Sequence, residues 1–592
     1  MQDVDALAGF SEPSARWFRR VFAEPTRAQR EAWASIRTGD HTLVVAPTGS
    51  GKTLAAFLWA IDRLMSGTDQ TVADGKRGTS ILYISPLKAL GVDVERNLTA
   101  PLVGIARERA QLGLDSREIT VGVRSGDTPP SERRRQVAAP PDILITTPES
   151  LYLLLTSNSR SMLRNVRTVI VDEVHAVAAT KRGAHLALSL ERLDALLPHP
   201  VQRIGLSATV RPLDAVAKFL GGAAPVSIVA PPSSKAFDLR VAVPVPDLSA
   251  IAPVRRDETE SVSEDLFGDA TRSIRDDDSP DGTRPGSIWP YVESEIVDRV
   301  LQHRSTIVFV NSRGLAERLT ARLNEEYERR LHAQEPAPTD HDADTPPRKR
   351  LKNADLIGGS GEFAGAATDL ARAHHGSVSK EQRAEVEDAL KSGRLRCVVA
   401  TSSLELGIDM GDVELVIQVE APPSVASGLQ RIGRAGHQVG AVSTAVCYPK
   451  HRADVLRSAV VAERMLAGNI EQLKPISQPL DVLAQHTVAA AAMDRWQVTD
   501  WLACIRRSAP FAQISDALLE SVLDLLAGKY PSDAFASLRP RIVWDRDADW
   551  FEARPGAQRL AVVSGGTIPD RGLFGVFMTC LLYTSPSPRD KR

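Results

Sequence analysis

The segment HTLVVAPTGSGKTLAAFLWAIDRLM, residues 41–65, joins an apolar run to an amphipathic helix through a glycine-rich turn. Backbone N–H groups in such a turn can surround a phosphate, and the start of the following helix favours negative charge. The pattern predicts a P-loop that binds ATP with Mg²⁺, in which Lys52 reaches the β/γ-phosphates and Thr53 is a metal ligand. The turn residues expected to hold the nucleotide are Thr48, Gly49, Ser50 and Gly51. A plain glycine turn between a strand and a helix is the alternative interpretation.

Apolar runs like the one before this turn recur along the chain, separated by helical stretches. They lie at 41–47, 80–86, 142–148, 168–175 and 203–209, and again at 305–313, 396–402, 414–420 and 443–449. Near-continuous apolar runs of this length are typical of parallel strands that are covered on both faces. We therefore expect an α/β fold with two tandem parallel-sheet domains, at 1–250 and 288–451.

Two charged segments interrupt the alternation of strands and helices. Residues 255–284 contain ten acidic and five basic side chains, and residues 333–365 contain six acidic and four basic ones. Such segments cannot bury enough apolar surface to fold by themselves. They predict an acidic linker at 251–287 and a mobile insertion at 333–365.

Beyond residue 451 the pattern changes to helices. The stretches VLRSAVVAERML, PLDVLAQHTVAAAAM and ISDALLESVLDLLAG have helical character, and the β-like runs RIVWDRDADWFEA and QRLAVVSG follow them. Three helices with a β wing predict a winged-helix domain at 452–555.

The bulk composition excludes several classes of protein. The 592 residues are 43% hydrophobic and carry a formal net charge of −2, which excludes a disordered tail, a collagen-like repeat and a histone-like polycation. No run approaches the roughly 18 apolar residues that span a bilayer. The first residues lack the basic start and apolar core of a secretory signal. We expect a cytoplasmic protein without a membrane partner, and the sequence identifies no protein partner.

A second chemical signal is the sequence VDEVH at 171–175, at the end of an apolar run. Adjacent carboxylates that leave a strand beside a P-loop form a Walker-B site, in which Asp172 holds Mg²⁺ and Glu173 orients and deprotonates the attacking water. An Asp-Glu pair alone is a weak signal. Its position after a P-loop and before Ser207-Ala208-Thr209 makes it strong.

A third signal is QRIGRAGH at 430–437 in the second half of the chain. Arg431 and Arg434 lie about one helical turn apart and therefore share a helix face. Guanidinium groups can stabilise the charge of a γ-phosphoryl group in transfer, so we predict that Gln430, Arg431 and Arg434 complete the catalytic set. The alternative is a solvated basic helix end.

Together these segments resemble superfamily 2 helicases over roughly residues 20–450. The resemblance implies two RecA-like domains, with Gln29 as the adenine contact, Asp409 at the nucleotide ribose, and His175, Ser207 and Thr209 as coupling residues. It also implies contacts to the nucleic-acid backbone from short polar segments, although each of these could equally be a strand-end cap. The predicted contacts are Ser85, Pro86, Lys88, Gly126, Asp127, Thr147, Pro148, Asn311, Arg313, Thr401 and Ser402.

Three longer stretches, at 172–193, 401–437 and 478–486, are similar to the large helicase-related (Lhr) family. That resemblance implies ATP-driven, 3′-to-5′ translocation on single-stranded DNA, unwinding of DNA and RNA:DNA duplexes, and a role in DNA repair. It also predicts that residues 556–577 begin a fourth domain. The polar run at 578–592 departs from the family, and we expect it to be a non-native tail that follows a truncation.

Three other functions stay open from the sequence. One is an RNA helicase of the DEAD-box type, against which the DEVH sequence and the winged helix argue. Another is an ATPase that is stimulated by single strands and remodels protein–nucleic-acid complexes without unwinding. The third is a non-catalytic binding module, which the intact Lys52, Asp172, Glu173, Arg431 and Arg434 argue against.

Overall fold

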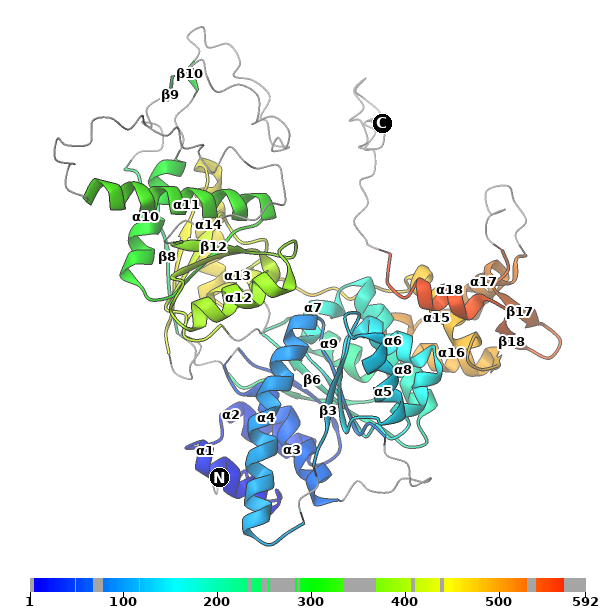
Figure 1. Ribbon diagram of the computed structural model, residues 1–592. Coiled ribbons are helices and arrows are strands. Elements are labelled where there is room, and N and C mark those ends of the chain that lie inside the picture. The colour runs from blue at the N-terminus through cyan, green and yellow to red at the C-terminus, as the bar shows by residue number, and fades with distance from the viewer. Residues whose placement is uncertain are drawn as a thin grey trace, which may run out of the picture. The chain divides into compact units, whose positions relative to one another are not determined.

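The computed structural model describes residues 5–47, 49–67, 78–115, 118–232, 236–246, 254–255, 283–284, 288–334, 369–405, 410–436, 441–529 and 539–568. Contacts divide these residues into two compact units. The first contains the described residues up to 46, those within 50–231 and those from 472 onward, and the second contains 47–49 and those within 232–471. Figure 1 shows the elements of each unit, which are described separately below.

In the described part of the first unit, a parallel sheet of seven strands has the order β3-β4-β2-β5-β6-β1-β7. The five apolar runs predicted for this half each contain a strand, which confirms the α/β prediction. The two strands that the apolar pattern missed, β3 and β7, are the sheet edges and are only partly buried, so their sequences lack a continuous apolar run. The strands are β1 (His41–Val45), β2 (Ile81–Ile84), β3 (Val121–Arg124), β4 (Ile143–Thr146), β5 (Thr168–Val171), β6 (Gln202–Ser207) and β7 (Val226–Val229).

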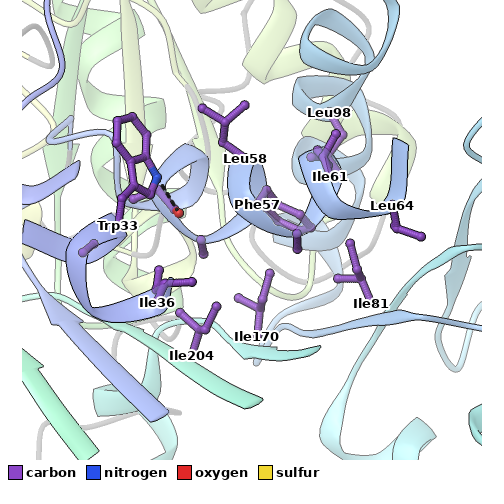
Figure 2. Packing of buried hydrophobic residues seen from close by; sticks show 14 of the residues in the cluster. Trp33, Ile36, Phe57, Leu58, Ile61, Leu64, Ile81, Leu98, Ile170 and Ile204 are labelled. Carbon is purple, nitrogen blue, oxygen red and sulfur yellow. Dashed lines mark hydrogen bonds between the residues drawn. The ribbon is translucent and has the colours of Figure 1, made fainter. Parts of the chain in front are cut away.

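Helices cover both faces of this sheet, which explains why its inner strands are largely apolar. Successive residues of β1 point to opposite faces. Val44 lies in one buried cluster, while Leu43 and Val45 lie in the other. Figure 2 shows side chains of α2 and α3 packed over Ile170 and Ile204 of the sheet. The helices are α1 (Glu12–Val21), α2 (Arg27–Ile36), α3 (Lys52–Ser66), α4 (Lys88–Gln111), α5 (Pro130–Ala138), α6 (Pro148–Leu155), α7 (Val174–Ala178), α8 (Lys181–Leu196) and α9 (Leu213–Gly221).

The second unit contains another parallel sheet, with six described strands in the order β12-β13-β11-β14-β15-β8. Its strands are β8 (Phe237–Val241), β11 (Thr306–Phe309), β12 (Ala371–His374), β13 (Cys397–Ala400), β14 (Leu415–Val419) and β15 (Ser443–Tyr448). Its helices are α10 (Trp289–Gln302), α11 (Arg313–Gln334), α12 (Lys380–Lys391), α13 (Val425–Ile432) and α14 (Arg452–Leu466). The prediction of two tandem parallel sheets is therefore confirmed.

The predicted boundary at residue 250 is wrong, because β8 pairs with β15 and belongs to the second sheet. The partner strand lies about two hundred residues away in the chain, so no local pattern could reveal the pairing. Most of the predicted linker at 251–287 lies outside the described residues, apart from a short antiparallel pair of β9 (Val254–Arg255) and β10 (Thr283–Arg284). Of the predicted insertion at 333–365, the structure describes only the end of α11.

The winged-helix prediction is confirmed in kind, but its limits need correction, and the predicted β-like run QRLAVVSG instead forms the helix α18 (Ala557–Val563). Helix α14 packs against α13 and β8 in the second unit, so the winged helix does not begin at 452. Ala557 and Ala561 of α18 are buried in the winged-helix core, so 556 does not begin a separate domain. The tail at 578–592 lies outside the described residues. The elements are α15 (Leu480–Ala491), β16 (Trp496–Gln497), α16 (Val498–Arg507), α17 (Asp516–Ala527), β17 (Ile542–Asp545), β18 (Trp550–Ala553) and α18 (Ala557–Val563).

The winged helix and the first sheet's domain share one hydrophobic core, which the separate-domain prediction did not include. Tyr152 of α6 and Leu188 of α8 belong to the same buried cluster as residues of α15 and α16. At its centre, the ring of His486 lies 4.5 Å from that of His185 and 5.1 Å from that of Tyr152, measured between centroids. These contacts explain why the two parts form a single compact unit.

The two buried histidines predict a loss of stability in acid. Burial lowers the pKa of His185 to about 4 and the pKa of His486 well below its ordinary value. Below about pH 6.5 the unfolded chain therefore binds protons that the folded chain does not, so the free energy of unfolding falls as the pH drops. The substitution His486→Phe removes one of these groups and keeps an aromatic ring. Urea unfolding at pH 7 and pH 5 should show a smaller decrease for this variant, and an equal decrease would contradict the assignment.

Candidate nucleotide and nucleic-acid sites

The order of strands in the first sheet separates two groups of predicted site residues. The segments predicted to bind the nucleotide follow β1, β5 and β6, which are neighbours in the sheet. The segments predicted to contact the nucleic-acid backbone follow β2, β3 and β4, which are also neighbours. The carboxyl ends of parallel strands meet at one edge of a sheet, where α/β proteins bind their ligands. The sheet therefore offers one half of this edge to a nucleotide and the other half to a second ligand.

The glycine-rich turn after β1 has the backbone that a phosphate-binding loop requires. Gly49 and Gly51 have φ angles of +81° and +78°, a region that L side chains rarely adopt. A Cβ at Gly51 would also lie 2.4 Å from the side-chain nitrogen of Gln29. Lys52 is the first residue of α3, and its Nζ donates to the Ala46 carbonyl at 2.5 Å. Thr53 follows it in the first turn, and Thr48 lies outside the described residues.

Gln29 connects the segment before α2 to the glycine-rich turn. Its Oε1 accepts from the Thr26 N–H at 2.9 Å, and Thr26 Oγ1 accepts from the Gln29 N–H at 3.2 Å, which forms a capping box. The Gln29 Nε2 donates to the Gly51 carbonyl at 3.3 Å, and Thr26 Oγ1 donates to the Ser50 carbonyl at 2.9 Å. The predicted adenine contact thus lies directly against the turn.

Asp172 and Glu173 lie where β5 ends, and both are buried. The Tyr83 hydroxyl donates a hydrogen bond to Asp172 Oδ2. Burial and the neighbouring Glu173 carboxylate raise the pKa of Asp172 to about 7, although the Tyr83 hydrogen bond and the Lys52 charge oppose this shift. Glu173 has a φ of +45°, a strained backbone for a residue with a side chain, which is typical of functional sites.

These residues fit a magnesium ion that is shared with a nucleotide. Two adjacent buried carboxylates repel each other, and a cation would relieve that repulsion. In the described residues no group of three or more His, Cys, Asp or Glu side chains could hold a metal ion. Mg²⁺ usually takes one or two protein ligands and completes its shell with phosphate oxygens and water. Asp172 and Thr53 would be the protein ligands.

His175 joins the Walker-B segment to the end of β6. Its Nδ1 accepts from the Ala208 N–H at 3.2 Å and lies 3.2 Å from Ser207 Oγ and 3.5 Å from Glu173 Oε2. Burial lowers the pKa of His175, so the ring is neutral at pH 7 and carries its proton on Nε2. The structure thus brings together His175 and Ser207, two of the three predicted coupling residues. Thr209 is exposed.

The residues after β2 and β4 that were predicted to contact nucleic acid also form hydrogen bonds within their own turns. Ser85 Oγ donates to the Leu87 carbonyl at 2.8 Å, directly before α4, with Pro86 buried between them. Thr147 Oγ1 accepts from the Ser150 N–H and caps α6, in which Pro148 is the first residue. The alternative of strand-end caps therefore holds for these side chains, and a ligand at this edge would meet backbone N–H groups and helix starts.

Lys88 and Asp127, predicted to contact the same ligand, contact each other. Lys88 Nζ lies 2.6 Å from Asp127 Oδ1, and both side chains are about half exposed. Gly126 is exposed next to this ion pair. A phosphate and a carboxylate compete for the same ammonium group, so Lys88, and not Asp127, carries the charge that fits a phosphate.

In the second unit, Arg431 is buried among partners of its own domain. Its guanidinium donates to Glu405 Oε1 at 2.7 Å, to Asn311 Oδ1 at 2.9 Å and to Gln418 Oε1 at 3.0 Å. With 2% exposure, this side chain holds together residues of its own domain, and its contact with a γ-phosphate stays a prediction. Arg434 is equally buried and donates to the Glu405 carbonyl at 2.9 Å.

The residues of the second unit that were predicted to contact nucleic acid lie after two neighbouring strands, β11 and β13. Asn311 and Arg313 follow β11 and are exposed, and Arg313 Nη1 donates to Ser377 Oγ at 2.9 Å. Thr401 and Ser402 follow β13. Gln430 lies in α13, and Asp409 lies outside the described residues.

Sequence reasoning missed four side chains that hold these sites together. Tyr83, Arg182, Glu405 and Gln418 each bond to a predicted site residue or its neighbour. They lie within strands, helices or turns and carry no recognisable spacing, so no signal in the sequence distinguished them from other polar residues.

Three protein-family models match parts of the chain. They describe the DEAD/DEAH box helicase at 26–216, the helicase conserved C-terminal domain at 366–438, and the winged helix domain of large helicase-related protein at 463–585. The last of these extends past residue 578, where we expected a foreign tail to begin.

Similar curated proteins and solved structures agree with these models. The chain is 59% identical over 575 residues to the Lhr helicase/probable uracil glycosylase of Mycolicibacterium smegmatis and 55% identical over 575 residues to the Lhr helicase/uracil glycosylase of Escherichia coli. The matches cover 97% and 96% of the chain, which spans 35% of the length of each relative. The structure of Mycobacterium smegmatis helicase Lhr bound to ssDNA and AMP-PNP is similar with a TM-score of 0.78 and 56% identity, over 96% of this chain and 64% of that one.

A parallel sheet that carries a P-loop, DEVH and SAT at one edge, followed by a second parallel sheet, defines a superfamily 2 helicase of the DEAD/DEAH type. The winged helix on the first domain and the identity along nearly the whole chain narrow this class. The chain belongs to the large helicase-related (Lhr) family.

Proposed function

We propose that this chain is the ATP-hydrolysing motor of a helicase that moves 3′-to-5′ on single-stranded DNA and unwinds DNA or RNA:DNA duplexes. The observation that carries the proposal is the division of the first sheet's edge into two neighbouring halves. The nucleotide half follows β1, β5 and β6, and the strand half, where the nucleic-acid strand is predicted to bind, follows β2, β3 and β4. The solved relative bound to ssDNA and AMP-PNP supports both ligands. The direction of movement, the hybrid substrate and a role in DNA repair, in the cytoplasm at the nucleoid, rest on the family resemblance.

The residues at the nucleotide half have distinct roles in this proposal. Lys52 holds the β/γ-phosphates, and Glu173 orients the attacking water and accepts its proton. Bound Mg²⁺ would neutralise phosphate charge next to Asp172 and Thr53. His175 would pass a change at Glu173 to the SAT segment, because its ring touches both. Arg431 and Arg434 of the second domain are the proposed contacts of the γ-phosphate, and Arg431 also donates to Asn311 Oδ1.

The groups at the strand half indicate which feature of DNA the protein would recognise. Helix starts, backbone N–H groups and one lysine recognise phosphates rather than base edges, so binding should depend little on base sequence. Each phosphate contact releases condensed counterions, so affinity should fall steeply with salt. Measuring ssDNA affinity by fluorescence anisotropy between 50 and 200 mM NaCl should show a fall of about tenfold or more. A salt-independent or strongly sequence-dependent affinity would contradict this mode of binding.

The decisive experiment measures ATP turnover with and without single-stranded DNA, together with unwinding of DNA, RNA and hybrid duplexes that carry overhangs of either polarity. The proposal expects stimulation by ssDNA and unwinding from a 3′ overhang. Unwinding of RNA duplexes alone would favour a DEAD-box type of activity. Stimulated turnover without any unwinding would favour the remodelling ATPase.

A further inference from the structure

Arg182, near the start of α8, bonds to two of the segments at the strand half of the edge. Its Nη1 donates to the Pro86 carbonyl at 2.6 Å. Its Nε and Nη2 both donate to the Glu149 carboxylate, the second of these at 2.9 Å, in the bidentate arrangement that makes Arg–carboxylate pairs strong. Both side chains are about one-third exposed, so this bridge lies at the surface of the edge rather than in the core.

The two segments that Arg182 joins each precede a helix. Pro86 lies between β2 and α4, and Glu149 is the second residue of α6, directly after Pro148. Strands β2 and β4 are neighbours in the sheet, so the two helix starts lie side by side at its edge. One guanidinium therefore fixes both of the helix starts at which the proposed function expects DNA phosphates.

Glu149 presents an electrostatic difficulty at this position. A helix start attracts anions, and a carboxylate there takes the place of a phosphate and repels one nearby. Burial raises the pKa of Glu149, but the hydrogen bonds and charge of Arg182 outweigh this and lower it, so Glu149 is ionised at pH 7. Its negative charge needs a partner if a phosphate backbone is to approach.

We propose that Arg182 is a positioning residue for strand binding, which cancels the charge of Glu149 and holds the starts of α4 and α6 together for the phosphate backbone. This inference rests on the proposed function, because it assigns a role at the same DNA-binding edge. It differs from a purely structural role in one respect. Removing Arg182 should weaken DNA binding chiefly because it leaves Glu149 unpaired, so removing that charge as well should restore binding.

The test compares ssDNA affinity among Arg182→Met, Glu149→Gln and the double variant, by fluorescence anisotropy with a labelled oligonucleotide. Arg182→Met should weaken binding about tenfold, because it leaves a carboxylate without its cation beside the phosphates. Glu149→Gln should bind within about twofold of the unmodified chain, and the double variant within about threefold. Arg16→Met, which removes an arginine from the exposed Arg16–Glu12 pair on α1, is the control for the loss of one positive charge and should leave affinity unchanged.

Each result either supports or contradicts the role proposed for Arg182. If the double variant binds as weakly as Arg182→Met, charge masking is wrong. If Arg182→Met fails to fold, Arg182→Gln replaces it in both the single and the double variant: the single variant should again lose about tenfold in affinity and Glu149→Gln should restore binding to within about threefold, whereas no rescue would overturn the inference. If the unmodified chain neither binds ssDNA nor shows stimulated ATP turnover, the proposed function fails together with this inference. Normal binding by the unmodified chain with no rescue overturns the inference alone.

Discussion

Replacing Lys52 by alanine should abolish ATP turnover while leaving ssDNA binding largely intact. Lys52 begins α3 directly after the glycine turn, next to the buried Asp172 and Glu173. Its ammonium is the group expected to stabilise charge on the β/γ-phosphates, and the loss of one such electrostatic contact typically slows catalysis by about 10²–10³-fold. A steady-state ATPase assay at saturating ssDNA measures this effect.

The location of Lys52 supplies the control for this experiment. It follows β1, in the nucleotide half of the edge, whereas the proposed DNA contacts follow β2, β3 and β4. Affinity for ssDNA without nucleotide should therefore change by less than about threefold. Lys218→Ala, at an exposed position of α9, removes a lysine far from this turn in the chain and should retain full turnover. Equal turnover in Lys52→Ala and the unmodified chain would disprove the P-loop assignment.

The second large effect concerns stability, and its site is Arg203 on β6. This side chain is 2% exposed, and its Nη2 lies 2.9 Å from Glu191 Oε1 and 2.8 Å from Asp194 Oδ2. Arg507 of the winged helix pairs with the same two carboxylates at 2.8 Å. Arg203→Met would leave a buried carboxylate without its main cation, and breaking a buried pair in this way costs about 3–5 kcal/mol. Urea unfolding at pH 7 measures the loss.

The pH dependence of this loss tests its cause. Burial already raises the pKa of Glu191, although Arg203 and Arg507 act to lower it. Without Arg203 the pKa of Glu191 rises further, so Glu191 becomes protonated as the pH falls and the buried charge that has lost its main cation disappears. The difference in stability between the variant and the unmodified chain should therefore be smaller at pH 5 than at pH 7. A constant difference would point to lost packing instead.

Arg507→Met is the matched comparison, because Arg507 pairs with the same carboxylates from a half-exposed position. Water can replace its contacts, so the variant should lose no more than about 1 kcal/mol. A loss as large as that of Arg203→Met would mean that the junction between the winged helix and the first domain depends on Arg507.

The α/β class, both parallel sheets and the chemical identity of the P-loop and DEVH segments could be predicted because each depends on residues that are close in the sequence. A buried strand requires a short apolar run, and a phosphate-binding turn requires glycines at fixed spacing before a helix. The errors came where distant contacts dominate. Strand β8 joins the second sheet, α14 packs in the second unit, and α18 completes the winged-helix core.

In the candidate site, too, contacts within one segment could be predicted and contacts between distant segments could not. Asp172, Glu173 and His175 are close together in the chain, so their proximity in the site could be predicted from the sequence. The Tyr83 hydroxyl, in contrast, reaches Asp172 from another strand. Arg431 shows most clearly which contacts the sequence alone could not predict. Its spacing from Arg434 predicted a shared helix face, but its bonds to Asn311, which follows β11, and to Gln418 of β14 could not be predicted from that spacing.

Local residue order therefore determined which segments bind phosphate, carry carboxylates or begin helices, since backbone conformation and capping depend on immediate neighbours. The arrangement of those segments depended on the sheet. In the sequence the segments predicted to contact nucleic acid lie between the first nucleotide segment and the other two, but the strand order β3-β4-β2-β5-β6-β1 sorts them into two separate halves of one edge. The order of the strands depends on which strands pair, on the burial of both faces of the sheet and on how the connecting helices cross it. These contacts join segments that are distant in the chain, so no single segment determines the order.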